Sequence, residues 1–255
     1  MVHYTDKTIH LTDIVFPKNI NHHETLFGGA ALSYMDKIAF IAATRFGRRH
    51  FVTASCDNID FKKPALKGNI VDFSATVISA GRRSLKVEVV MEAEDMLTGE
   101  RVTCTRGIFN MVSVLSPDEI PLKELKMGCR NNAETDADLR IVELVFADDT
   151  NHHGTLFGGH GLSLMAKAGF IASTQKCREV MVLASLNKTN FMAPINIGGI
   201  VDLSAKVIRI GTKSLTVHVK MVGEELLSGK RTFCAESDFI MVAVGEGGKS
   251  KKISN

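Results

Sequence analysis

The 255-residue sequence lacks the features that mark several large classes of protein. Its formal net charge is only +3, so it lacks the strongly basic surface on which nucleic-acid binding depends. No apolar run reaches the roughly 20 residues that a membrane-spanning helix needs, and from the polar start of the sequence we expect no signal peptide. We therefore expect no nucleic-acid partner and no association with membranes.

Cysteine chemistry is also sparse. The sequence contains five cysteines and no Cys-x-x-Cys pair: Cys56, Cys104, Cys129, Cys177 and Cys234. An odd, scattered set without an export signal is typical of reduced thiols, which predicts a cytoplasmic protein. Paired histidines occur at 22–23 and 152–153, but neither pair has an acid or a cysteine at ligand spacing on a helix. We therefore predict no metal site.

What the sequence does contain is a long internal repeat. The stretch NHHETLFGGAALSYMDK begins at Asn21, and NHHGTLFGGHGLSLMAK begins at Asn151. Shifting the chain by 130 residues aligns 11–114 with 141–244 without a gap, and 47 of these 104 positions are identical. A period this long exceeds any solenoid unit, so the repeats are whole domains.

Four segments follow from this repeat. We place the first repeat at 1–114, a polar linker at 115–137, the second repeat at 138–244 and a flexible basic tail at 245–255.

Each repeat should contain one helix and about five strands. The helix is expected at 28–45, where apolar residues occupy most sides and so predict burial. Strands rich in Val, Ile, Thr and Phe are expected at 8–16, 51–61, 69–81, 84–95 and 102–115. This composition indicates an antiparallel sheet wrapped around the helix. An open strand edge on such a sheet favours side-by-side pairing of the two units.

The order of motifs resembles a known family. A strand, the box ending in TLFGG, a buried helix carrying Met-Asp, then VTAS, IDF and GRRSLKVEV follow one another as in the acyl-CoA thioesterase family of the hotdog superfamily. The resemblance covers nearly all of both repeats. It implies an α+β fold of two tandem hotdog domains, each an antiparallel β-sheet wrapped around a long central helix. It also implies hydrolysis of fatty acyl-CoA to free fatty acid and CoA without any cofactor, in a homo-oligomer that would be a trimer of chains.

Asp36 is the candidate catalytic residue. It lies within the apolar segment SYMDKIAF, where a carboxylate is costly unless it is paired or used. The resemblance places the family's catalytic acid here, as a general base or as a nucleophile. The alternative is an outward-facing Asp36 that pairs with Lys37 or another neighbour.

Helix geometry restricts the partners of Asp36. Gly28 and Gly29 offer amide donors at a helix N-terminus, but they lie about 10–12 Å from Asp36 along the helix axis. One thioester carbonyl cannot contact both groups. The donors that serve Asp36 must therefore come from the other repeat.

If the two helices pair antiparallel, Asp36 lies next to the second repeat's NHHGTLFGG segment, which begins at Asn151. That composite site would use Asn151 to orient water or substrate, Gly158 and Gly159 to stabilise the oxyanion, and His160 as a substrate contact. A turn or N-cap role is the alternative for Asn151, since asparagine favours both.

The mirror site would combine Asn21, Gly28 and Gly29 with Ala166, which cannot act as a base. We therefore expect one working site per chain and one inactive mirror site.

Contacts with CoA are expected from the strand after the helix and from the G-R-x-S turn, as the resemblance implies. The matching positions are Ala54, Ser55, Cys56, Arg83, Ser84, Leu85, Ser185, Lys213 and Ser214. The alternative is a solvated basic turn. Lys62 and Lys63 are either phosphate contacts or ordinary edge charges, and the second repeat has Met192 and Ala193 in their place.

Two other functions fit the sequence. A hotdog-type enoyl-CoA hydratase would also use an acid, but it would normally pair that acid with a histidine, and none is evident near Asp36. A non-catalytic acyl-CoA-binding sensor would have no need to keep Asp36.

Overall fold

The computed structural model describes residues 8–114, 137–245 and 249–253. The predicted linker at 115–137 lies outside these residues, apart from residue 137. The elements of the first repeat are β1 (Ile9–Ile14), α1 (Gly28–Gly47), β2 (His50–Cys56), β3 (Ile59–Phe61), β4 (Ile70–Ala80), β5 (Ser84–Glu94) and β6 (Arg101–Val114). Those of the second are β7 (Leu139–Leu144), α2 (Gly158–Cys177), β8 (Met181–Leu186), β9 (Thr189–Phe191), β10 (Ile200–Ile210), β11 (Ser214–Glu224) and β12 (Arg231–Ala243).

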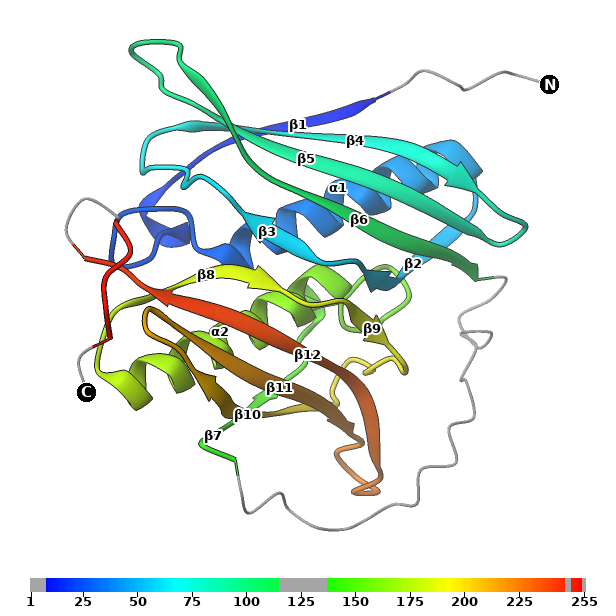
Figure 1. Cartoon of the computed structure of the whole chain (residues 1–255). Coiled ribbons are helices and arrows are strands. Elements are labelled where there is room, and N and C mark those ends of the chain that lie inside the picture. The colour runs from blue at the N-terminus through cyan, green and yellow to red at the C-terminus, as the bar shows by residue number, and fades with distance from the viewer. Residues whose placement is uncertain (1–7, 115–136, 246–248, 254–255) are drawn as a thin grey trace.

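In each repeat an antiparallel sheet wraps around one helix (Figure 1). Strand β5 shows the physical basis, because buried residues alternate with exposed or half-buried ones along its length. Its inward residues are apolar and belong to the core that includes α1: Leu85, Val87, Val89, Met91 and Ala93. The α1 helix ends at Arg48, which adopts the left-handed conformation and donates its N–H to the Thr44 carbonyl.

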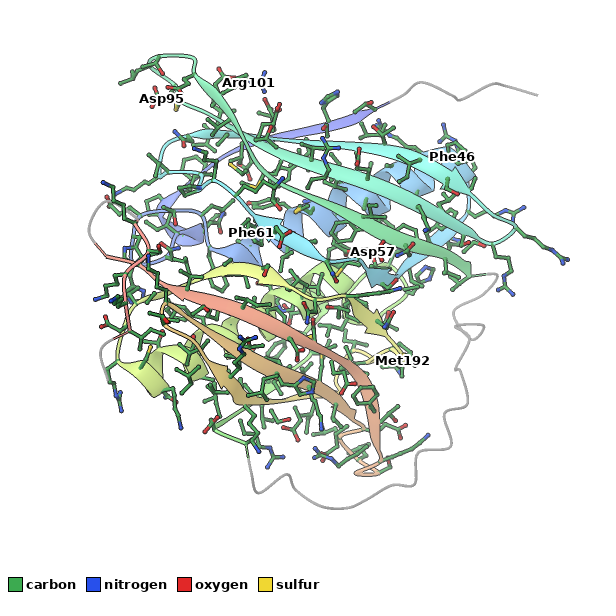
Figure 2. The ribbon with its side chains drawn as sticks, viewed as in Figure 1. Phe46, Asp57, Phe61, Asp95, Arg101 and Met192 are labelled. Carbon is green, nitrogen blue, oxygen red and sulfur yellow. The ribbon has the colours of Figure 1, made fainter. Side chains whose placement is uncertain are left out.

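The strand expected at 51–61 is two strands, so each repeat has six strands and not five. The break falls at Asp57, which is labelled in Figure 2. The Asp57 N–H donates to the Ile108 carbonyl at 2.8 Å. Since β2 and β3 have different outer partners, this break lets each pair with its own strand of the other repeat.

The two sheets join into one sheet of 12 strands. Ser55 on β2 lies opposite Asn190 on β9, and Asp60 on β3 lies opposite Ser185 on β8. Ser185 is the equivalent of Ser55 in the second repeat, and Asn190 is the equivalent of Asp60, so the same pair of positions meets twice. The repeats are therefore related by an approximate two-fold axis. The predicted side-by-side pairing is confirmed.

The helices cross at their glycines. A Cβ placed at Gly159 would lie 2.9 Å from the Ser33 carbonyl oxygen, and one at Gly29 would lie 3.0 Å from the Ser163 carbonyl oxygen. Ser33 and Ser163 are equivalent residues, so each helix N-terminus abuts the middle of the other helix, as in the predicted antiparallel arrangement. Only glycine permits this approach without displacement. Neither described helix combines the length and apolar character needed to cross a membrane.

The end of the chain returns to the second repeat. The N–H of Lys251 donates to the Ala243 carbonyl, and that of Ile253 donates to the Thr212 carbonyl, both at 2.9 Å. Ile253 also packs against the core. For residues 249–253 the prediction of a flexible tail is wrong, because these backbone hydrogen bonds and this apolar contact fix them.

We expect Gly29→Ala to lower the free energy of unfolding by roughly 1–3 kcal/mol, because the added methyl group overpacks the helix crossing. Urea unfolding measures the change. Gly161→Ala is the matched control: its added Cβ would meet nothing closer than 3.5 Å, and the first repeat carries Ala31 at this position. Equal losses from the two substitutions would contradict the close crossing.

Candidate active site

Asp36 lies at the junction of α1, β2 and α2. Its side chain is 0% exposed, so the outward-facing alternative with Lys37 is wrong. The Thr53 hydroxyl donates to Oδ1 at 2.6 Å, and the Gly159 N–H donates to Oδ2 at 2.7 Å. The structure thus brings Asp36 together with the second repeat's glycine pair, across 123 residues of sequence.

Burial alters the acidity of this carboxyl group. Loss of solvation raises the pKa of Asp36 from an ordinary 3.8 to about 6, although the hydrogen bonds from Thr53 and Gly159 act in the opposite direction. The group is therefore ionised at neutral pH and is a stronger base than an exposed carboxylate.

Gly158 and Gly159, at the start of α2, have different roles. The Gly159 amide donates to Asp36, so the prediction that it serves an oxyanion is corrected: it positions the carboxylate. The Gly158 amide has no acceptor among the described residues, and Gly158 lines a cavity. A Cβ at Gly158 would lie 3.3 Å from Asp36 Oδ2 and 3.1 Å from the Thr53 Cβ. Any side chain at this position would therefore press against Asp36 and Thr53, and glycine keeps the cavity wall beside Asp36 thin.

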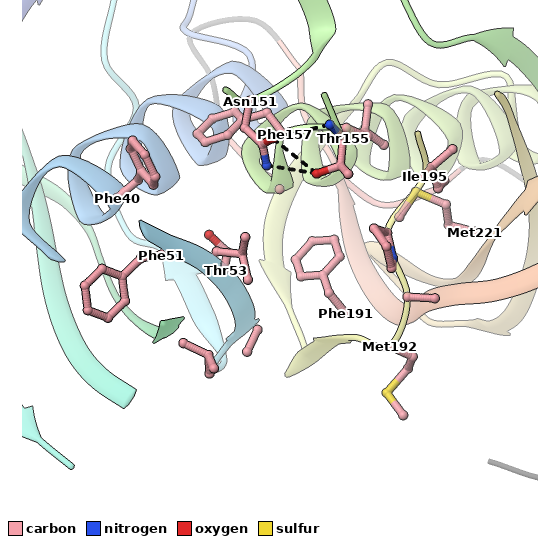
Figure 3. A pocket seen from close by; sticks show the side chains of 17 residues that line it. Phe40, Phe51, Thr53, Asn151, Thr155, Phe157, Phe191, Met192, Ile195 and Met221 are labelled. Carbon is pink, nitrogen blue, oxygen red and sulfur yellow. Dashed lines mark hydrogen bonds between the residues drawn. The ribbon is translucent and has the colours of Figure 1, made fainter. Parts of the chain in front are cut away.

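That cavity has a volume of about 140 Å³ and lies between the repeats (Figure 3). Thr53 and Gly158 form the part of its wall that covers Asp36. Its remaining lining is mostly apolar and includes Phe40, Phe51, Phe157, Phe191 and Met221. An apolar lining beside a buried carboxylate suits an acyl group whose reactive carbon must meet a base in the absence of bulk water.

Asn151 lines the same cavity and also organises its own loop. Its Oδ1 accepts the N–H of His153 at 2.9 Å, and its Nδ2 donates to the Thr155 hydroxyl at 3.0 Å. Asn21 makes the equivalent bonds in the first repeat. The turn role considered for Asn151 is therefore present in both repeats, and only Asn151 combines it with a position beside Asp36.

The histidines differ from expectation. His160 is not among the residues that line the cavity. Its Nε2 lies 3.3 Å from Asp149 Oδ1. The predicted contact of His160 with substrate is therefore not supported. His50, His152 and His153 gather nearby, with 2.9 Å between His50 Nδ1 and His152 Nε2. Within the described ranges, these three form a group whose ring nitrogens all lie within 4.8 Å, so they are the residues that could hold a metal ion. The sequence did not reveal the group because His50 is distant from the His pair along the chain.

The residues expected to contact CoA fall into three groups. Ala54 lines the cavity, and Ser84 pairs with Val112 at its rim, next to Arg83. Cys56 and Leu85 are buried in the core, so a side-chain contact from either of them is wrong. The others lie elsewhere: Ser55 accepts a hydrogen bond from Asn110, Ser185 is at the sheet junction, and Lys213 and Ser214 are near the end of the chain.

The mirror position differs from the Asp36 position at two residues. Ala166 is buried where the first repeat has Asp36, and Leu183 occupies the place of Thr53. Asn21 and Gly28 line a second cavity there, and Leu183 lies against Gly28. Both the acid and its hydroxyl partner are therefore apolar in this half. Comparison of the repeats at position 53 could have identified Thr53, but the strand pattern alone gave no reason to single it out.

Comparisons with known proteins agree with this architecture. The family model described as Thioesterase superfamily matches the chain twice, at residues 23–100 and 153–229. The chain is 37% identical over 129 residues to an uncharacterized acyl-CoA thioester hydrolase of Bacillus subtilis, an alignment that covers 48% of this chain and 75% of that protein.

Two solved structures are also similar. An acyl-CoA hydrolase from Agrobacterium tumefaciens is 43% identical, with 96% of this chain and 98% of that chain covered and a TM-score of 0.44. A putative oleoyl thioesterase from Lactobacillus plantarum is only 10% identical but has a TM-score of 0.66, over 95% of this chain and 99% of that chain. The latter likeness concerns the fold alone.

The buried carboxylate leads to a prediction about stability. A pKa raised from 3.8 to about 6 means that ionised Asp36 destabilises the fold above pH 6. We expect Asp36→Asn to have a free energy of unfolding higher than wild type by roughly 2–3 kcal/mol at pH 8. This advantage should shrink as the pH falls from 6 to 4, where Asp36 is protonated in wild type. Urea unfolding at several pH values measures it, and a difference that does not change with pH would contradict the assignment.

Proposed function

Since the chain belongs to the Thioesterase superfamily, we propose that it hydrolyses fatty acyl-CoA to free fatty acid and CoA, at one composite site per chain. The observation that carries this proposal is the contact of 2.7 Å between the Gly159 amide and the Asp36 carboxylate. This contact places a buried base at the wall of an apolar cavity between the repeats. The relatives named as acyl-CoA thioester hydrolases support the substrate class.

In the proposed reaction the acyl group occupies the cavity and its carbonyl carbon lies above Gly158. Asp36 removes a proton from a water molecule whose oxygen attacks this carbon, or Asp36 attacks directly and forms a mixed anhydride that water then hydrolyses. In both routes the Gly158 N–H stabilises the carbonyl oxyanion. In the first route, collapse of the tetrahedral intermediate breaks the C–S bond, and the CoA thiolate takes the proton that Asp36 removed from water. In the second route, the C–S bond breaks as the anhydride forms, and the water that hydrolyses the anhydride supplies the proton for the thiolate. Thr53 and Gly159 hold the carboxylate in place throughout.

Asn151 is proposed to orient the attacking water or the thioester. Its Oδ1 and one Nδ2 hydrogen serve its loop, which leaves the second Nδ2 hydrogen for the cavity. Arg83 and Ser84 are proposed to contact CoA at the rim, because they lie beside Val112, which lines the cavity.

We further propose a cytoplasmic homo-oligomer, a trimer of double-hotdog chains acting in fatty acid metabolism. Leu97 is 96% exposed and Leu227 is 99% exposed, at the tips of equivalent hairpins. Such apolar side chains are suited to burial in an interface. Cell fractionation tests the location.

The central experiment is thiol release from a series of acyl-CoAs of increasing chain length. We expect Asp36→Ala and Asn151→Ala each to lower kcat/KM by about a hundredfold or more. Asn21→Ala is the matched control, because it removes the same loop hydrogen bonds beside a position that has no acid, and it should stay near wild type.

If Asn21→Ala is the damaging asparagine change, the composite site is wrong. If wild type releases no thiol from any acyl-CoA, the thioesterase proposal fails. Retained binding would then favour the acyl-CoA sensor, and loss of enoyl absorbance would favour the hydratase.

For the assembly, we expect light scattering to give about three times the mass of a single chain. The double substitution Leu97→Lys/Leu227→Lys should lower this mass if the hairpin tips form the interface, because it places charges in a buried contact. A wild-type mass equal to one chain would contradict the trimer.

A further inference from the structure

The half of the molecule without the acid keeps a complete pocket. Each of the 17 residues that line the cavity beside Asp36 has its counterpart, 130 positions away, in the lining of the second cavity. This second cavity has a volume of about 330 Å³, larger than the 140 Å³ of the first. The chain has therefore lost the reactive groups on this side without filling the space.

The inner end of this pocket cannot perform hydrolysis by the proposed route. Ala166 and Leu183 stand where the other half has Asp36 and Thr53. A Cβ placed at Gly28 would lie 2.8 Å from the Leu183 Cβ, as one at Gly158 would lie 3.1 Å from the Thr53 Cβ, so an apolar side chain packs here in place of the hydroxyl-bearing one. A thioester held here would meet no carboxylate at the position that corresponds to Asp36.

The outer end has gained charge. Lys62 and Lys63 line this pocket at the positions that Met192 and Ala193 occupy in the cavity beside Asp36. Both lysines are exposed, and their backbone is fixed because the Lys62 N–H donates to the Cys104 carbonyl at 2.8 Å. Lys67 pairs with Glu24 and Lys251 pairs with Glu179, but neither Lys62 nor Lys63 has an ion-pair partner among the described residues.

An apolar interior with two unpaired ammonium groups at its mouth suits an amphipathic anion. The interior takes an alkyl chain, and the lysines attract phosphate or carboxylate oxygens. The pocket beside Asp36 has the same apolar interior but no cation at these two positions. The two pockets should therefore differ in how strongly their binding depends on the charged end of a ligand.

We propose that the second pocket is a non-hydrolytic binding site for the acyl thioester of CoA, with the acyl chain inside and the phosphates against Lys62 and Lys63. The choice of ligand rests on the function proposed above, because the same substrate reaches both pockets. Each chain would then hold one molecule that is hydrolysed and one that is retained.

Binding stoichiometry tests this assignment on the full chain. The probe is a thioether analogue of a fatty acyl-CoA, which cannot be hydrolysed, measured by isothermal titration calorimetry. We expect two analogue molecules per chain in wild type. Lys62→Met/Lys63→Ala, which installs the residues that the second repeat carries, should weaken one site at least tenfold. Lys67→Met, outside the pocket, is the control and should keep both sites.

Thiol release by wild type is measured on the same preparation, which separates the two proposals. Hydrolysis together with one analogue per chain, or two sites that the lysine substitutions do not affect, would overturn the second site alone. Absence of hydrolysis would overturn the proposed function, whatever the stoichiometry.

Competition then identifies the ligand. CoA without an acyl group should displace the analogue from the lysine-dependent site, because it carries the phosphates. Displacement by a free fatty acid but not by CoA would overturn the thioester assignment.

Discussion

The close crossing of α1 and α2 is the constraint on which the rest of this structure depends. Glycine at position 159 lets the second helix approach until its own amide reaches the Asp36 carboxylate in the first helix. Without that approach Asp36 would be a buried carboxylate with no backbone donor, which is costly in an apolar interior. The sheet junction serves the same end, because pairing of β2 with β9 and of β3 with β8 fixes how the helices face each other.

The same burial that makes Asp36 a suitable base weakens the fold. Loss of solvation raises its pKa to about 6, and the two hydrogen bonds reduce this rise without abolishing it. The mirror half shows the alternative state of the same position, since Ala166 and Leu183 fill it with apolar atoms. The two halves of one chain thus hold the carboxylate-bearing and the apolar version of one packing arrangement.

Much of this arrangement follows from the sequence, and the reasons are local. The repeat, the buried helix and the strand alternation predicted the fold, and the spacing from Gly28 to Asp36 required a site shared between the repeats. The break of the strand at Asp57, the role of Thr53 and the occupied amide of Gly159 did not follow. Each depends on where two distant segments meet in space, and no periodicity within a segment carries that information. The contact predicted for His160 was wrong for the same reason, because this residue meets Asp149, which lies in a turn before α2 and not on the helix itself.

The duplication has one more consequence. In a symmetric dimer of identical chains, any substitution near the two-fold axis occurs twice and alters both pockets together. Here the gene encodes each pocket separately, so a change is inherited by one side while the other continues unaltered. The 130-residue repeat therefore allows each pocket to evolve its own chemistry, and a single chain can come to distinguish two ligands with one inherited scaffold.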